Sequence, residues 1–311
     1  MAVRIGLNGH DPVLYILSTL GLLEESLAQI GEAVHWVPYT PGPRAPWLLG
    51  TELDFVGCGQ TPMIYAHQDG VDAVYVASSP NRPRQGSLLV RTNGNIASPA
   101  DLAGRAVGYA PSAWPAQLVA GALDQAGLTL ADITTVPPDA GADLSALLSG
   151  ELAAAVILGP RLIQAEETGS VRELVPTDSA VCNRHLFTTT RRFAQENAPI
   201  LTLILTAMQQ ACLWVRDNLD EAARRRAQET RYDAASWGGD HRTWRQIFAR
   251  MPWAVVPIDD AFIAQQDHHI GLFTRAGLLS GAGRARDHYL PELIWTVRSA
   301  VDAADNPVEV A

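Results

Sequence analysis

The first two-thirds of the chain alternate short apolar runs with amphipathic stretches. Apolar runs typical of buried strands occupy residues 3–7, 33–37, 55–57, 73–77, 88–91, 106–109, 133–136 and 154–158. Between them, residues 14–30 and 116–126 carry apolar positions at the spacing of helices that bury one face. This alternation predicts an α/β fold in which a parallel sheet is covered by helices.

From about residue 194 the pattern becomes helical, with helices predicted over 199–218, 219–229, 242–249 and 259–276. We expect this tail to pack on the first part of the chain. Its tryptophans are expected in the core or between lobes rather than on a ligand: Trp214, Trp237, Trp244 and Trp253.

One pattern recurs four times: a strand ends, a small or polar residue follows, and a proline opens a helix. It occurs at Asp11-Pro12, at Thr61-Pro62, at Trp114-Pro115 shortly after Ser112, and at Gly159-Pro160. In an open α/β sheet such turns lie at the carboxyl ends of strands, where ligands bind, and a helix start attracts anions. Proline also suits the first helical position for local reasons, so one turn alone is ambiguous. Four together favour a ligand cleft.

Charge and length exclude several classes of partner. At 311 residues the chain is long enough for two lobes. A net charge of −10 argues against a nucleic-acid partner. No unbroken apolar window reaches the length of a membrane span. Because the sequence opens directly on a strand pattern, we expect no secretory signal and a cytoplasmic protein, or an extracytoplasmic one if this is a mature form.

The reactive residue types are sparse. Three widely spaced cysteines, Cys58, Cys182 and Cys212, favour neither a disulfide framework nor a metal site, so we expect no metal. All 23 basic residues are arginine, which excludes a P-loop lysine and a Schiff base to pyridoxal phosphate. We expect no cofactor.

Several segments resemble the NMT1/THI5-like superfamily, which includes the solute-binding proteins for sulfonates, nitrate and taurine. The similar segments are residues 50–62, 88–92 with 96–108, 122–132, 144–155 and 214–222. The resemblance implies a type II periplasmic-binding-protein fold, with two α/β lobes, a hinge and a cleft between them. Lobe 1 would hold residues 1–91 plus 188–311 and lobe 2 residues 92–187.

The same resemblance implies where a ligand would bind. The implied residues are Asn8, Gly9, His10, Asp11, Gly59, Gln60, Thr61, Ser112, Ala113, Trp114, Gly159 and Pro160, with Trp47 as a cover. Apart from the resemblance, Arg44 and Arg161 are candidates for pairing with the charge of the ligand, although an exposed surface position is the simpler interpretation. Trp47 and Trp114 could equally pack on a lobe surface. The implied ligand is a small organic anion, sulfonate-like or an aromatic acid, bound for an ABC importer whose permease would be a partner if the chain is exported.

A cytoplasmic enzyme on the same fold is the alternative, since the superfamily also contains a sulfinate desulfinase. The triad of that enzyme is not matched here, because Gly9 stands at the nucleophile's place and Val56 at the arginine's. The one pair that could supply catalysis is Cys58 with His10, by activation of a thiolate. The simpler interpretation is a buried cysteine and a loop histidine. His67 is expected to be a solvated helix residue.

Overall fold

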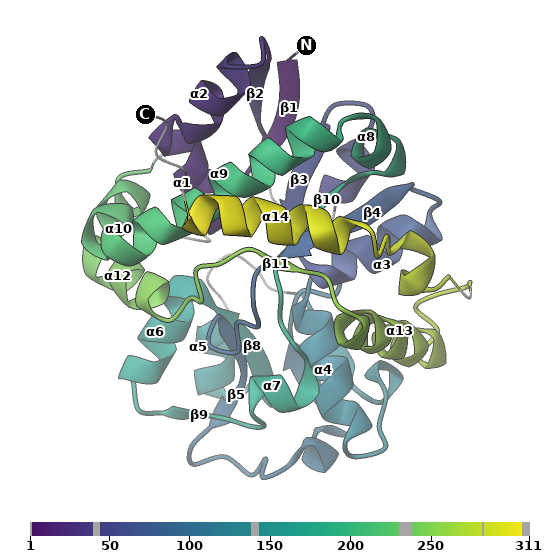
Figure 1. Cartoon of the computed structure of the whole chain (residues 1–311). Coiled ribbons are helices and arrows are strands. Elements are labelled where there is room, and N and C mark those ends of the chain that lie inside the picture. Colours follow the sequence, from purple (N-terminus) through teal and green to yellow (C-terminus); the bar gives the residue numbers. More distant parts are fainter. Residues whose placement is uncertain (1, 40–43, 138–142, 230–237, 282, 307–311) are drawn as a thin grey trace.

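The computed structural model describes residues 2–39, 44–137, 143–229, 238–281 and 283–306 and contains two β-sheets (Figure 1). The six-stranded sheet has the order β11-β4-β10-β3-β1-β2 and the five-stranded sheet the order β7-β6-β8-β5-β9. The strands are β1 Ala2–Leu7, β2 Ala33–Pro38, β3 Phe55–Cys58, β4 Ala73–Ser78, β5 Gly86–Arg91, β6 Ala106–Gly108, β7 Thr134–Val136, β8 Ala154–Leu158, β9 Val171–Glu173, β10 Leu186–Thr190 and β11 Val256–Pro257.

The prediction of a purely parallel sheet was wrong, because both sheets are mixed. β10 runs antiparallel to its neighbours β3 and β4, and β5 runs antiparallel to β8 and β9. The physical reason is that β5 and β10 each enter a sheet directly from the other sheet, without the helical crossover that a parallel neighbour requires. All eight predicted strands are present, and β9, β10 and β11 are additional.

Helices cover the sheets on both faces (Figure 1). They are α1 Pro12–Leu20, α2 Leu22–Ala28, α3 Gln60–Gln68, α4 Pro115–Asp124, α5 Asp143–Ser149, α6 Gly159–Glu167, α7 Thr177–Ala180, α8 Arg191–Glu196, α9 Ala198–Asp217, α10 Leu219–Ala227, α12 His241–Ala249, α13 Asp260–Arg275 and α14 Leu293–Asp305, with 3₁₀ turns η1 Ala45–Leu48, η2 Pro99–Leu102, η3 Leu130–Asp132 and η4 Ala285–His288. The predicted helix over 14–30 is split, because Gly21 takes a left-handed φ of 75°.

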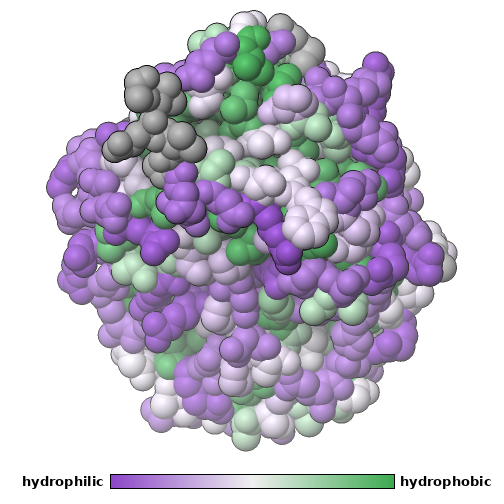
Figure 2. Space-filling view, viewed as in Figure 1, coloured by the Kyte–Doolittle hydropathy of each residue, from purple (hydrophilic) through white to green (hydrophobic). Residues whose placement is uncertain are grey.

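The long helix α9 belongs to the core of the six-stranded sheet. It is long and apolar enough to span a membrane by length and composition, but 56% of its apolar window is buried inside the protein. Its buried residues join α1 and α14 in one apolar cluster with β1. We therefore interpret α9 as a core helix. Hydrophilic side chains cover most of the face seen in Figure 2, as on a solvent-exposed surface.

Two segments pass between the sheets side by side. Residues 79–85 connect β4 to β5, and residues 182–185 lead into β10. The Ser79 N–H donates to the His185 carbonyl and the Arg82 N–H to the Asn183 carbonyl, each at 2.8 Å. We call these segments the crossover. The lobe boundaries stay a prediction, and β5 pairs with the five-stranded sheet although it lies within residues 1–91.

The C-terminal helices bridge the two halves on two sides. Arg250, at the end of α12, makes a bidentate ion pair with Glu166 of α6, at 3.0 and 2.6 Å. Arg275 of α13 pairs with Asp124 of α4 at 2.8 Å. Trp244 and Trp253 are buried in the main core, as expected, whereas Trp237 lies outside the described residues.

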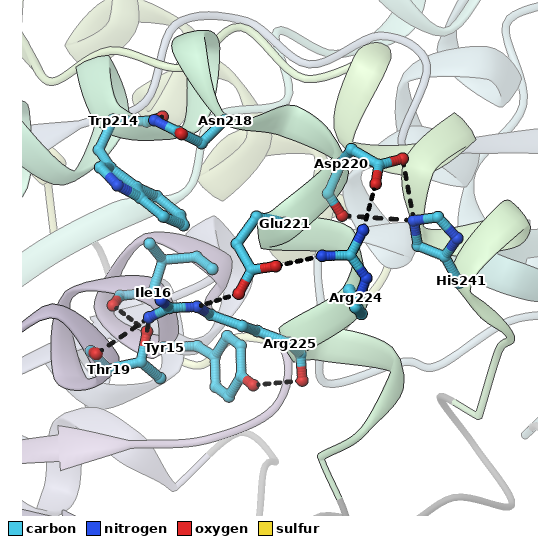
Figure 3. A network of polar contacts seen from close by, with 10 residues as sticks. All are labelled: Tyr15, Ile16, Thr19, Trp214, Asn218, Asp220, Glu221, Arg224, Arg225 and His241. Carbon is cyan, nitrogen blue, oxygen red and sulfur yellow. Dashed lines mark hydrogen bonds and ion pairs between the residues drawn. The ribbon is translucent and has the colours of Figure 1, made fainter.

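Helix α10 is fastened to α1 by a polar network (Figure 3). The guanidinium of Arg225 donates to the Thr19 carbonyl at 3.1 Å and to Glu221 at 3.1 Å. The Tyr15 hydroxyl returns a hydrogen bond to the Arg225 carbonyl at 2.9 Å. The helical tail is thereby fixed beside the middle and the C-terminal end of α1.

Candidate functional site

Asp11 occupies the start of α1 with its own carboxylate. Its Oδ1 accepts hydrogen bonds from the N–H groups of Val13 and Leu14 at 3.1 and 3.0 Å. Its Oδ2 lies 3.0 Å from His185 Nε2, within ion-pair distance but without hydrogen-bond geometry. Because the side chain is fully buried and caps the helix, the start of α1 is already satisfied and is no seat for a further anion.

The other three predicted helix starts lack a side-chain cap and lie around the crossover. In the described part of the chain, no N-cap side chain bonds the start of α3, α4 or α6. A Cβ built on Gly59 would lie 4.0 Å from the Cβ of Trp114, which joins the starts of α3 and α4. The indole of Trp114 lies against Gly86, where a Cβ would be 2.8 Å from the ring. The Gly159 N–H at the start of α6 donates to the Gln85 carbonyl at 3.3 Å.

The side chains of Gln60 and Thr61 are engaged within the protein. The Thr61 hydroxyl donates to Gln117 Oε1 at 3.0 Å, and Gln117 donates to Gln266 Oε1 at 2.7 Å. Gln60 Nε2 donates to the Cys182 carbonyl at 2.6 Å. Both predicted residues are fully buried. They therefore bring α3, α4 and α13 together, and their side chains are not free to bind a ligand.

The loop after β1 is likewise tied to the protein. Asn8 Oδ1 accepts from the His10 N–H at 2.7 Å, and Asn8 Nδ2 donates to the Tyr39 hydroxyl. The Gly9 carbonyl accepts from Arg226 at 3.2 Å. The His10 side chain is exposed. These contacts hold the loop beside the start of α1.

The remaining predicted residues have mixed surroundings. Ser112, Ala113 and Trp114 are half-buried, Pro160 is buried, Arg161 is half-buried and Arg44 is exposed. Trp47 donates to Asp69 at 3.1 Å, at the C-terminal end of α3. Since α3 has nine residues, this end lies about 13 Å from Gly59. We therefore leave Trp47 out of the proposed site.

Cys58 is a poor candidate for a nucleophile. Its side chain is 5% exposed, and burial raises the pKa of the thiol to about 12. A reactive cysteine needs the opposite shift. The histidine beside the buried Asp11 carboxylate is His185, which sequence analysis did not single out.

Sequence reasoning missed the polar residues of the crossover. Buried side-chain atoms without hydrogen-bond partners gather there and at the Asp11 cap; they belong to Asp11, Ser78, Asn81, Arg82, Gln85, Arg184 and His185. A cluster of this kind indicates a polar binding site or ordered water. The one sequence signal was the polar run at 79–85, which is too polar to continue β4.

The comparisons with known proteins agree with this architecture. A protein of Escherichia coli (strain K12) named for binding aliphatic sulfonates is 28% identical over 225 residues, 71% of this chain and 69% of that protein. The periplasmic aliphatic sulphonate binding protein SsuA from Escherichia coli superimposes with a TM-score of 0.81 at 24% identity, over 92% of this chain and 91% of that chain. SsuA from Xanthomonas axonopodis pv. citri bound to MOPS gives a TM-score of 0.77 at 22% identity, over 93% and 98%.

The fold is shared more widely, since the desulfurization enzyme DSZB superimposes with a TM-score of 0.61 at 15% identity, over 96% of this chain and 99% of that chain. The solved structures confirm the predicted type II periplasmic-binding-protein fold. The sequence itself matches the family described as NMT1/THI5 like over residues 31–222, more than half of the chain. The chain therefore belongs to the NMT1/THI5-like family.

Proposed function

We propose that this protein binds a small organic anion, a sulfonate or a related acid, as the solute-binding subunit of an ABC importer. The observation that carries the proposal is the meeting of three helix starts, α3, α4 and α6, that lack side-chain caps. The dipoles of these helices make such a place favourable for negative charge. The net charge of −10 does not oppose this, because these dipoles act over a few ångströms.

Trp114 supplies the contact for the organic part of the ligand. The residue is half-buried at the start of α4, between Gly59 and Gly86. An aromatic ring beside an anion site suits an alkyl or aryl sulfonate better than an inorganic ion. Relatives named for binding aliphatic sulfonates support this ligand class, and a permease would be the protein partner. Such a role requires a location outside the cytoplasmic membrane, as for periplasmic SsuA.

Titration calorimetry with 1-butanesulfonate, benzenesulfonate and benzoate tests the proposal. We expect one site per chain and an affinity that falls about tenfold in Trp114→Ala. Trp295→Ala is the matched control, because Trp295 is 69% exposed on α14. Absence of binding for all three compounds would reject the proposal.

The enzymatic alternative is supported by the shared fold with DSZB alone. Its candidate nucleophile Cys58 is buried, with the pKa of the thiol raised to about 12. Release of sulfite from an aryl sulfinate by the purified protein would favour the enzyme.

A further inference from the structure

We propose that Arg82 is the charge partner of the ligand's anionic group, at the base of the site. The inference rests on the proposed function and deepens it by naming the residue that selects an anion over a neutral ligand. Arg82 lies in the crossover between β4 and β5, outside the four turns that the family resemblance indicated.

Arg82 is buried, and its backbone position is fixed. The residue is 7% exposed. Its N–H donates to the Asn183 carbonyl at 2.8 Å, and Asn183 Nδ2 donates back to the Arg82 carbonyl at 3.3 Å. These reciprocal bonds hold the residue between the two crossover segments.

The guanidinium, in contrast, is poorly paired. Among the described residues, its Nη2 reaches only the neutral Asn183 Oδ1, at the long distance of 3.5 Å, and its Nε is buried without a partner. A buried guanidinium normally pairs with a carboxylate, often through two hydrogen bonds. Without such a partner, burial is costly.

The neighbouring carboxylate does not supply that partner. Asp11 is close enough to raise the pKa of Arg82 by its charge, but burial outweighs it and lowers the pKa to about 10. Oδ1 of Asp11 is used by the start of α1, and Oδ2 faces His185. Arg82 thus stays protonated at neutral pH and keeps hydrogen-bonding capacity.

The surroundings of Arg82 are those of the proposed site. Three residues further along, the Gln85 carbonyl accepts from Gly159 at the start of α6, at 3.3 Å. The next residue, Gly86, packs against the ring of Trp114, which lies at the start of α4. Asn81 and Gln85, which lie one and three residues from Arg82 in sequence, also have buried side-chain atoms without hydrogen-bond partners among the described residues. An anion held by these helix starts would therefore lie beside the segment that carries Arg82, a buried arginine whose guanidinium has no carboxylate hydrogen bond among the described residues.

Titration of Arg82→Gln with 1-butanesulfonate, and with neutral 1-butanesulfonamide, tests the assignment. We expect the sulfonate affinity to fall about 10- to 100-fold, as for a lost charged hydrogen bond, and the sulfonamide affinity to change little. Arg84→Gln is the matched control, because Arg84 lies two residues away and is exposed. A general structural defect would weaken both ligands equally, and that outcome overturns the proposal.

A second measurement covers the case in which Arg82→Gln does not fold. In arginine-¹⁵N-labelled wild-type protein, the Nε resonance of Arg82, assigned with Arg82→Lys, is expected to shift when 1-butanesulfonate is added. An unchanged resonance in protein that binds the sulfonate overturns the assignment and leaves the proposed function standing. Failure of wild-type protein to bind any of the three acids overturns both.

Discussion

Gly57 of β3 lies directly against the carboxylate of Asp11, so that a Cβ on residue 57 would be 2.8 Å from Asp11 Cγ. The same Cβ would lie 2.7 Å from Nε2 of His185. Because Gly57 has no side chain, the buried Asp11 carboxylate and the buried His185 ring both fit against β3.

Gly57→Ala is expected to destabilise the protein by about 1–3 kcal/mol, because the Asp11 carboxylate cannot move away without breaking the α1 cap. Urea unfolding measures the change. Gly271→Ala in α13 is the control, since the nearest atom to its Cβ is Arg275 Nη1 at 3.9 Å. That substitution should raise stability by up to about 1 kcal/mol. Equal stability of Gly57→Ala and wild type would contradict the contact.

Gln117→Leu is expected to cost about 1–3 kcal/mol in the free energy of unfolding. The change leaves the buried Thr61 hydroxyl and Gln266 Oε1 without partners. Gln125→Leu, just beyond the end of α4 and exposed, should change stability by no more than about 0.5 kcal/mol. Similar unfolding curves for the two variants would show that the glutamine network is not stabilising.

The half-buried histidine pair on α3 and η4 predicts acid sensitivity. His67 stacks on His288 with ring centroids 3.4 Å apart and contacts the Ala73 carbonyl at 2.9 Å, so it is not the solvated residue that the sequence suggested. Burial, with His288 adding to it, lowers the pKa of His67 to about 3. Below pH 6.5 the unfolded chain is protonated at residue 67, whereas the folded protein is not. The free energy of unfolding should therefore decrease as the pH falls towards 3.

His67→Phe should therefore flatten the decline in stability between pH 6.5 and 4, by up to about 1.4 kcal/mol per pH unit. Urea unfolding at a series of pH values measures the slope. His35→Gln, on an exposed position of β2, should leave the slope unchanged. An identical slope in His67→Phe would mean that residue 67 titrates alike in both states.

Cysteine labelling separates the binding and enzyme interpretations. Cys58 and Cys212 are buried, and burial raises the pKa of each thiol, whereas Cys182 is half-buried. With a pKa of about 12, roughly one Cys58 in 10⁴ is a thiolate at pH 8. Iodoacetamide should thus modify Cys182 first and the other two only after unfolding, as mass spectrometry would show. Rapid modification of native Cys58 would revive the thiolate hypothesis.

The apolar pattern predicted the strands and the helical tail because burial of one face is recorded locally, in residues a few positions apart. Strand direction is not recorded in this way. Leu186–Thr190 became antiparallel through its position after the crossover, which depends on residues far from it in sequence.

In the candidate site, too, some residues could be predicted from the sequence and others could not. The helix starts at Gly59, Trp114 and Gly159 could be predicted from proline positions. Arg82 could not, since the segment Asn81-Arg82-Pro83-Arg84 has the composition of a solvated loop. Its hydrogen-bond partner Asn183 is about a hundred residues away in sequence and lies beside it only in the folded protein.

The central position of β10 has a consequence for biosynthesis. Leu186–Thr190 fills the place between β3 and β4, with Leu186 opposite both Cys58 and Ser78. Until residue 190 has left the ribosome, the facing edges of β3 and β4 have no partner, and the intervening residues 79–185 must be accommodated first. Pairing over such a sequence separation is slow, and unpaired edges aggregate. The emerging chain thus depends on rapid folding of the inserted half, or on chaperones, during its own synthesis.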